Sequence, residues 1–476
     1  MVRKTNPWLA MAFAALSLTS IGAPASALEK TDCHLRGLPD KAECFSLIRP
    51  EDPANPNGKT FNLHAARVPA LTPSKAEPLV FLAGGPGQSA IEVGGMVTQA
   101  LRPLLADRDL VFLEQRGTGD SNGFNCVTDD EDPYADLFAE ADLEAMTRAC
   151  LDAFDGDPQH YNTPNAIDDF AAMVQALGYD KVHVYGGSYG TRAALVFMRA
   201  HPQLIRSVIL DSMAPVQTVV GPFANHGHRA LTLLFDECEA NPGCNTTHPQ
   251  LRDNFWALWA RAGEAPIDVT VTHPTTFAPQ RLRLDQTKLF HLVINFLYSQ
   301  QQRQLLPVAI DAAADNNFAP LAGLMAAVSG GQGLYHGLTT NIVCNEDIRR
   351  QAPAAEETRT PFGDVSLSMW QRMCEHWPAY RLDDAHFEPV ASDLPVLALS
   401  GRLDPVTPPA WGEETVASLS NAQHLVADNA AHIVGLKGCG PKLIQAFLRA
   451  PGAPLDNADC LAELPGVHFM LNQNNH

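Results

Sequence analysis

The sequence has little positive charge and lacks the cysteine spacing of a metal site, and both absences exclude classes of function. It holds 33 Lys and Arg against 53 Asp and Glu, a formal net charge of −20. This acidic balance argues against nucleic acid or an anionic membrane as a partner. No Cys-x-x-Cys pair occurs, which argues against a metal site. With 46% hydrophobic and 18% charged residues and no low-complexity tract, the chain can bury a sizeable core.

Long hydrophobic runs are absent after the first 27 residues, and that segment is typical of a secretory signal. Arg3 and Lys4 precede an apolar run from Trp8 to Ala23, and Ala25-Ser26-Ala27 fits a cleavage site. The alternative, a membrane anchor, needs about 20 apolar residues. We therefore expect cleavage near Ala27, export to the periplasm or the medium, and no stable membrane anchor.

The ten cysteines are an even number, which in an exported chain favours disulfides over free thiols. Sequence alone does not fix which cysteines pair. The close spacing favours pairing of neighbours in chain order: Cys33–Cys44, Cys126–Cys150, Cys238–Cys244, Cys344–Cys374 and Cys439–Cys460.

Short apolar runs predict the buried strands of a parallel sheet. Between two of them, a helical pattern begins near Asn165 and stops at Gly178. Strands that alternate with helices indicate an α/β sheet. The predicted strands are 78–83, 110–113, 181–185, 207–210, 395–400 and 424–426.

The alternation breaks in the middle of the chain, where helical patterns dominate. A chain of 476 residues suits two domains, or one core with an insertion. We expect a signal peptide at 1–27, the first part of the core at 28–221, a mainly helical cap domain at 222–386, and the second part of the core at 387–476.

The strongest local signal is a G-x-S-x-G pattern formed by Gly186, Ser188 and Gly190. A predicted strand precedes it and a helical pattern follows it, which is the context this pattern needs. The tight turn leaves no room for side chains at the glycines and holds the serine at a helix N-terminus, where developing negative charge is favoured. Ser188 is therefore the candidate nucleophile; the alternative is a glycine-rich turn with an idle serine.

An acid and a histidine follow this serine in the order that the α/β-hydrolase fold uses. Asp404 follows the strand 395–400 and would orient the imidazole, although an Asp-Pro turn alone would also explain it. His432 follows the strand 424–426 and would act as general base. His424 is its nearest rival, but it begins that strand.

Acyl transfer also needs donors for the oxyanion of the tetrahedral intermediate. The amide of Tyr189, directly after the serine, is one candidate. Gly84 and Gly85, in a glycine-rich loop after the strand 78–83, let the backbone approach the substrate and supply the other. A phosphate-binding loop is the alternative, but the lysine of that motif is missing.

Together these motifs resemble the prolyl iminopeptidase and tripeptidyl aminopeptidase family of serine peptidases. The resemblance covers most of the mature chain, including His432 and the late Cys439. In three places the sequence departs from the family pattern without removing a catalytic group: Ala83 and Glu114 stand where His and Asp are usual, and Ala431 and Ile433 flank His432 in place of glycines. The matching segments are Gly84-Gly85-Pro86-Gly87, the run 114–121, Gly186–Gly190, Asp404, and the segments 344–347 and 374–378.

The resemblance implies an α/β-hydrolase fold that cleaves peptides near the amino terminus, with a cap that limits substrate length. Cap carboxylates of such enzymes bind the free α-ammonium group, which makes Glu346 the first candidate and Asp347 the second. Both could equally be surface acids beside Cys344. Arg116 is expected to tie its loop to the sheet.

The predicted enzyme is an exported serine aminopeptidase that acts on peptide substrates through an acyl-enzyme, without a metal or another cofactor. The main alternative is an exported carboxylesterase or amidase with the same triad. A binding protein on a hydrolase scaffold is a third. Residue preference, the number of residues released and the oligomeric state are left open by the sequence.

Overall fold

A computed structural model describes residues 28–126, 142–273, 275–328, 333–350, 359–456 and 458–472. The predicted signal peptide, 1–27, lies outside the described residues. Among the helices in the described ranges, none is long and apolar enough to cross a membrane.

The centre of the molecule is a nine-stranded sheet in the order β1-β2-β3-β5-β4-β6-β7-β10-β11. β1, β2 and β3 pair antiparallel, and β3 also pairs antiparallel with β5; from β5 to β11 the neighbours are parallel. The strands are β1 (Glu29–His34), β2 (Lys41–Pro50), β3 (Thr60–Val68), β4 (Leu79–Leu82), β5 (Leu110–Leu113), β6 (Val182–Gly187), β7 (Ile205–Asp211), β10 (Val396–Gly401) and β11 (Ala422–Ala427).

All six predicted strands are present, with ends shifted by at most two residues. The antiparallel strands β1, β2 and β3 were not among the predictions. β1 is mostly exposed, and β2 and β3 mix buried with exposed positions. They therefore lack the continuous apolar run that marks a strand buried on both faces.

Helices cover both faces of the sheet, as a parallel sheet requires. On β4, Val80 and Leu82 belong to one core cluster, which includes residues of α4 and α5, while Leu79 and Phe81 belong to the cluster with α1 and α16. The main helices of this part are α1 (Ala90–Ala100), α3 (Leu143–Ala153), α4 (Thr163–Ala176), α5 (Tyr189–Ala200), α15 (Pro409–Val416) and α16 (Gly440–Arg449); the short helices are η1 (Arg102–Ala106), η2 (Pro158–His160), η3 (Pro202–Leu204), η6 (Asp384–Phe387) and η7 (Ala458–Leu461).

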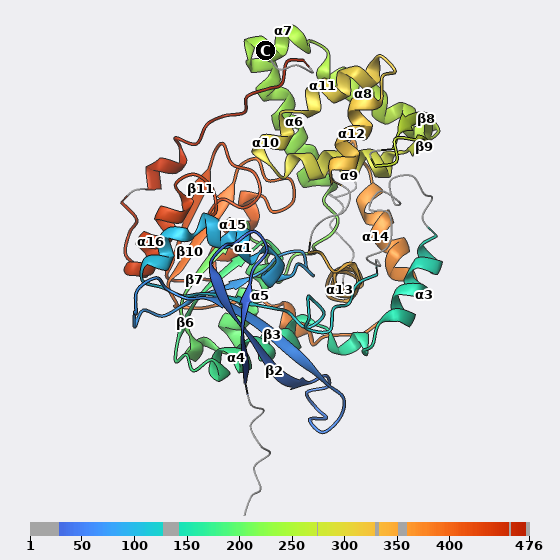
Figure 1. Ribbon diagram of the computed structural model, residues 1–476. Helices are drawn as coiled ribbons and strands as arrows, with labels where there is room; N and C mark the ends of the chain where they lie inside the picture. Colours follow the sequence, from blue (N-terminus) through green and yellow to red (C-terminus); the bar gives the residue numbers. More distant parts are fainter. Residues whose placement is uncertain are drawn as a thin grey trace, which may run out of the picture.

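A long segment inserted between β7 and β10 forms a second body above the sheet (Figure 1). Its first part has a hydrophobic core of its own, centred on residues such as Phe235, Phe255 and Phe290. The segment is mainly helical but carries a two-stranded hairpin. Its elements are α6 (Ala224–Ala240), α7 (Pro242–Thr247), α8 (Leu251–Glu264), β8 (Ile267–Thr272), β9 (Pro279–Leu284), α9 (Gln286–Leu297), α10 (Gln300–Arg303), α11 (Leu306–Ala314), α12 (Ala319–Val328), α13 (His336–Ile342), η4 (Val343–Ile348) and α14 (Val365–Glu375).

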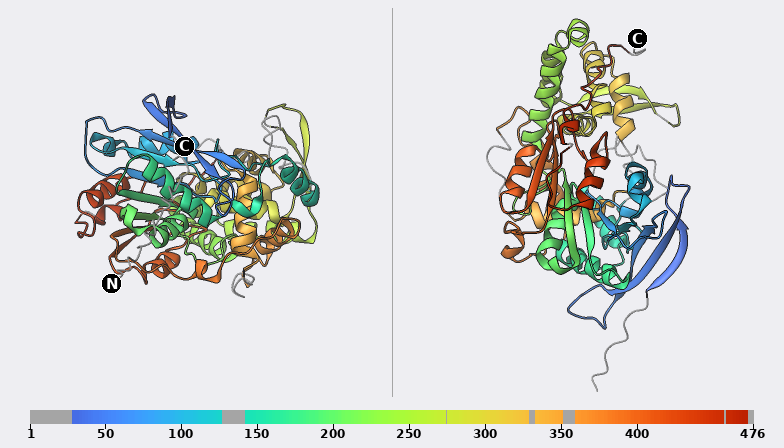
Figure 2. Two further views of the ribbon diagram at one scale, coloured as in Figure 1. Left: turned by 90° about the horizontal axis from the view of Figure 1, so that it is seen from below. Right: turned by 90° about the vertical axis from the view of Figure 1, so that its left-hand side faces the viewer.

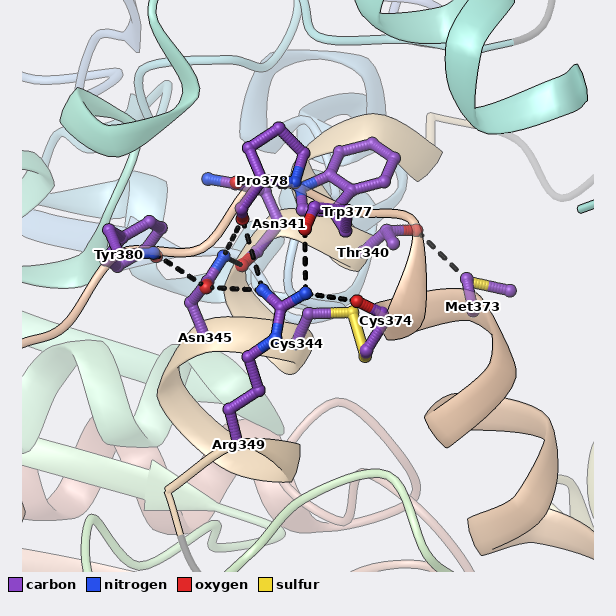
Figure 3. The surroundings of a disulfide bond; sticks show 10 residues. All are labelled: Thr340, Asn341, Cys344, Asn345, Arg349, Met373, Cys374, Trp377, Pro378 and Tyr380. Atoms are coloured by element: carbon purple, nitrogen blue, oxygen red, sulfur yellow. Dashed lines mark hydrogen bonds between the residues drawn. A yellow bond between two sulfur atoms is a disulfide. The ribbon is translucent and has the colours of Figure 1, made fainter. Parts of the chain in front are cut away.

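The last part of this insertion packs against the sheet-bearing core. Leu338, Cys344 and Trp377 belong to the core cluster that contains β4 and β6 residues. In Figure 3 the Cys344–Cys374 disulfide joins η4 to α14, and Arg349 donates to main-chain carbonyls around it, including that of Trp377 at 2.7 Å. The predicted segment 222–386 thus combines a separate helical body with a part that packs against the core.

Five disulfides hold the described chain, and they join the neighbours that the spacing favours.

The C-terminal segment runs from the core up to the helical body (Figures 1 and 2). There Met470 donates its amide to the carbonyl of Gln304, at 3.2 Å. The end of the chain therefore connects the two bodies.

Candidate active site

Ser188 lies at the sharp turn between β6 and α5, in a backbone conformation that non-glycine residues rarely adopt (φ 56°, ψ −126°). Gly186 and Gly190 of the motif must be glycines, because there is no room for a Cβ atom at either position. A Cβ on Gly186 would lie 2.2 Å from the carbonyl oxygen of Gly190, and one on Gly190 would lie 2.2 Å from that of Leu82. The motif therefore lets α5 begin directly against β4 and β6.

Asp404 is buried in the loop after β10 and pairs with His432, whose Nδ1 lies 2.8 Å from Asp404 Oδ2. The amides of Val406 and Thr407 each donate to Asp404 Oδ1 at 2.9 Å, and the Thr407 hydroxyl donates to Oδ2 at 2.7 Å. Burial works against the ionised carboxylate, but His432 and these amides outweigh burial and lower the pKa of Asp404. An ionised acid held this way can orient an imidazole.

A close approach of two loops brings the acid and the base together. A Cβ on Gly401, the last residue of β10, would lie 2.0 Å from the carbonyl oxygen of Ala431. The rival histidine, His424, instead faces Ser400, whose hydroxyl lies 2.9 Å from its Nε2. Of the two histidines, the structure brings His432 to the acid.

Three residues around His432 were not among the sequence candidates. The amide of His432 donates to the carbonyl of Tyr298 at 3.2 Å, and the Tyr298 ring packs edge-on against the imidazole with centroids 4.8 Å apart. Lys437 donates to the carbonyl of His432 at 2.8 Å, and Thr407 Oγ1 lies 3.2 Å from its Nδ1. The motif positions gave no signal for Tyr298, because it comes from the insertion, more than 130 positions away in the chain.

A pocket of about 560 Å³ opens onto Ser188 and His432. Four apolar side chains of α1 are among the lining residues, and so is Lys437. Among the described residues, no hydrogen bond joins Ser188 to His432, a contact that often tightens only when substrate binds. The lining residues are Phe81, Gly84, Gly85, Gln88, Val93, Met96, Val97, Ala100, Tyr185, Gly187, Ser188, Tyr298, Leu334, His432, Ile433, Leu436 and Lys437.

Two of the three candidate oxyanion donors are free. The amide of Gly84 donates to Gln88 Oε1 at 3.3 Å. Within the described chain, neither the amide of Gly85 nor that of Tyr189 has an acceptor. These two amides are therefore available to an oxyanion beside Ser188.

The structure does not bring Glu346 and Asp347 to this pocket, and neither is a surface acid. Both are buried in η4. Glu346 accepts from the amide of Thr163 at 2.8 Å and from its hydroxyl at 2.6 Å, and burial raises the pKa of Glu346 to about 7. Asp347 pairs with Arg192, with both carboxylate oxygens 3.0 Å from Nη1, and accepts the amide of Val220. Their partners are protein groups, which leaves no evident role in binding a substrate ammonium group.

Two residues of the segment 114–121 hold loops in place. Arg116 is buried and pairs with Asp169, with 2.8 Å between Nε and Oδ2, while also donating to main-chain carbonyls. Glu114 accepts the hydroxyl of Ser89 at 2.5 Å and the amide of Ile91 at 2.9 Å, which fixes the start of α1 beside the pocket.

Across the described ranges, no group of three or more His, Cys, Asp or Glu is placed to hold a metal ion.

The sheet order, the strained serine after β6 and the Asp–His pair define the class: the chain is a serine hydrolase of the α/β-hydrolase fold. Residues 77–237 match the family model described as alpha/beta hydrolase fold, and residues 359–460 match the one described as TAP-like protein. These matches, with the relatives named below, support the assignment of the chain to the α/β-hydrolase serine peptidases, the family of the tripeptidyl aminopeptidases and proline iminopeptidases.

Named relatives agree with this assignment. The chain is 27% identical over 468 residues to the serine protease Hip1 of Mycobacterium tuberculosis, which covers 89% of this chain and 88% of that protein. It is 30% identical over 194 residues to the tripeptidyl aminopeptidase of Streptomyces lividans, a match that covers 37% of this chain and 36% of that protein. It is 28% identical over 135 residues to the proline iminopeptidase of Heyndrickxia coagulans, covering 28% and 34%.

Proposed function

We propose that this protein is an exported serine exopeptidase that hydrolyses peptide bonds near the free amino terminus of peptides. Ser188 is the nucleophile, His432 the general base and Asp404 its orienting acid. The observation that supports the catalytic part is that Ser188, His432 and Gly85 line one pocket, with Asp404 paired to His432.

The geometry supports a two-step acyl transfer. Ser188 Oγ attacks the carbonyl carbon while His432 takes its proton, and the amides of Gly85 and Tyr189 stabilise the oxyanion. The C–N bond then breaks, and His432 gives the proton to the leaving amine. Water attacks the ester with His432 again as base, which releases the acid and restores Ser188.

The preference for amino termini rests on the relatives named aminopeptidase and on the insertion above the sheet. The insertion reaches the catalytic residues, because Tyr298 contacts His432 and Arg229 of α6 donates to the carbonyls of Arg402 and Asp404. A body in this position limits how far a substrate extends beyond the pocket. Glu346 and Asp347 are not part of this proposal.

The pocket itself favours a second candidate, an exported carboxylesterase or amidase. Its described lining contains Lys437 and His432 but no carboxylate, and most of its other side chains are apolar. An α-ammonium group would find no opposite charge there, whereas an apolar acyl or alcohol group would be buried favourably.

One substrate panel separates the two candidates. It compares aminoacyl and tripeptidyl amides that carry free or acetylated amino termini with small esters of matched acyl groups. The exopeptidase loses most of its kcat/KM when the terminus is acetylated. Equal rates for free and blocked amides would rule out the exopeptidase and favour the esterase or amidase.

The catalytic assignment has its own test, which does not depend on the substrate. A fluorophosphonate probe should label the wild-type protein at Ser188, and Ser188→Ala should lose both labelling and turnover while keeping its melting temperature. Turnover of Ser188→Ala above about one percent of wild type would contradict the assignment, since loss of a triad member costs far more.

We also propose that the protein is exported, with its signal peptide cleaved near Ala27, to the periplasm or the medium. The five disulfides support an oxidising compartment. Amino-terminal sequencing of the mature protein from the producing cell tests the cleavage position.

A further inference from the structure

Asp211 occupies the central position between the nucleophile and the acid. It is the last residue of β7, which lies between β6 and β10 in the sheet. In the strand registers, Asp211 pairs with Gly187 on one side and with Leu399 on the other. The turn that carries Ser188 and the strand that leads to Asp404 therefore flank this residue.

The two ends of Asp211 bind different parts of the catalytic site. Its main-chain carbonyl accepts the amide of Ser188 at 2.9 Å. Its carboxylate accepts the amide of Val434 at 2.8 Å and that of Gly435 at 2.7 Å, and Tyr185 donates its hydroxyl to the same group. The carboxylate is buried, and burial raises the pKa of Asp211. The hydrogen bonds from the three donors act in the opposite direction.

The backbone directly after His432 is strained. Ile433 has a φ of 61°, a left-handed conformation that is disfavoured for a β-branched side chain. Its amide donates to the hydroxyl of Ser212, at 2.9 Å, and the next two amides are those that bind Asp211. Asp211, the last residue of β7, and Ser212, the next residue, thus bind three consecutive amides of a strained turn.

We infer that Asp211 is a positioning residue: its carboxylate, with Ser212, holds the strained turn 433–435 so that the His432 imidazole faces both Asp404 and the pocket. This inference rests on the proposed role of His432 as general base. Asp211 does not contact the imidazole through a hydrogen bond in the described structure, so its effect on the reaction is through the backbone. Tyr298 and Lys437 complete the set by binding the amide and carbonyl of His432 itself.

The test is Asp211→Asn, with turnover measured on whichever acyl substrate the wild type hydrolyses. The carboxamide keeps the size of the side chain, but its NH₂ group faces a donor, so at least one bond to the turn is lost. We expect kcat to fall about 10- to 100-fold with KM changed less than about 3-fold, because the base is displaced while the pocket is kept. The rate of fluorophosphonate labelling of Ser188 should fall in parallel.

Asp109→Asn is the matched control. Asp109 likewise accepts a main-chain amide, that of Ala70 at 2.8 Å, and a tyrosine hydroxyl, that of Tyr179 at 3.2 Å. It lies just before the start of β5, whereas Ser188 follows the end of β6, so the two residues lie at opposite ends of these parallel strands. Its asparagine variant should show wild-type kcat and labelling, whatever its effect on stability.

A folded Asp211→Asn variant with kcat and labelling within about 3-fold of wild type would overturn the inference, and so would a rise in KM alone. If Asp211→Asn does not fold, Ser212→Ala is the second test, because it removes only the acceptor of the Ile433 amide. An unchanged kcat in Ser212→Ala would then overturn the inference. A wild-type protein that is not labelled at all would instead contradict the proposed catalytic role of Ser188.

Discussion

At the residue scale, the surroundings of Glu346 differ from what its sequence context indicated. It lies near Cys344 in a polar segment, yet its side chain is fully buried. Through Thr163, whose hydroxyl lies 2.5 Å from the Tyr189 hydroxyl, it connects η4 to the start of α5. Burial of a carboxyl group in such a place makes stability depend on pH.

We predict that Glu346→Gln removes a pH dependence of folding stability. The pKa of Glu346 is about 7 in the folded protein, against 4.5 for an ordinary glutamate. As pH rises from 4.5 to 7 the unfolded chain ionises while the folded one keeps its proton, so the free energy of unfolding falls by about 3 kcal/mol. Below and above this window the contribution is constant.

Chemical denaturation of wild type and Glu346→Gln across this pH range measures the effect. The variant should lose little at high pH, because a glutamine amide can both accept from the Thr163 amide and donate to the Thr163 hydroxyl. Glu144→Gln, at a side chain that is 59% exposed, serves as control and should follow the wild-type curve. Parallel curves for wild type and Glu346→Gln would contradict the prediction.

At the element scale, the site depends on how closely helices and loops approach strands. α5 begins so near β4 that Gly190 has no room for a side chain, and the loops after β10 and β11 meet at Gly401. These contacts show that the motif needs glycine because there is no room for a Cβ atom, and not because the backbone must be flexible. They also explain why the motif could be recognised in the sequence, since only glycine meets the requirement.

We predict that Gly190→Ala destabilises the protein by about 3 kcal/mol or more, because the added Cβ would lie 2.2 Å from the carbonyl oxygen of Leu82. Gly323→Ala is the control: in α12, nothing lies within 4 Å of a Cβ at this position, and alanine should stabilise the helix by about 0.5–1 kcal/mol. Thermal unfolding of both variants decides, and equal melting temperatures would contradict the steric argument.

At the scale of the whole molecule, the insertion and the core are connected at several points close to the proposed catalytic residues. Tyr298 binds His432, Arg229 binds the loop of Asp404, and the Cys344–Cys374 disulfide fixes the part of the insertion that packs on the core. The C-terminal segment adds a further connection through Met470. The insertion therefore helps to build the site as well as to cover it.

We predict that the disulfides contribute to stability according to the length of chain each one closes. Replacing both Cys344 and Cys374 by alanine, at a sequence separation of 30, should cost about 4 kcal/mol by loop entropy. The matched pair Cys238 and Cys244, at a separation of 6, should cost about 2 kcal/mol. Denaturant titrations of the two double variants measure the difference, and an equal or inverted order would contradict the loop-length argument.

The sequence by itself determined the parallel part of the sheet, the nucleophile turn, and the identity of the candidate triad. Buried parallel strands are continuous apolar runs, and the turn needs glycines at fixed positions, so both leave local patterns. The order of serine, acid and histidine along the chain then selected Asp404 and His432, and the structure places these two side chains in contact.

Only the tertiary structure decided which polar groups serve the site. It buried Glu346 and Asp347 away from the pocket, because their partners Thr163 and Arg192 come from distant segments that no local pattern connects. It placed Asp211 and Tyr298 against the histidine turn for the same reason. Burial and pairing depend on contacts between remote parts of the chain, and these exist only once the sheet and the insertion have packed together.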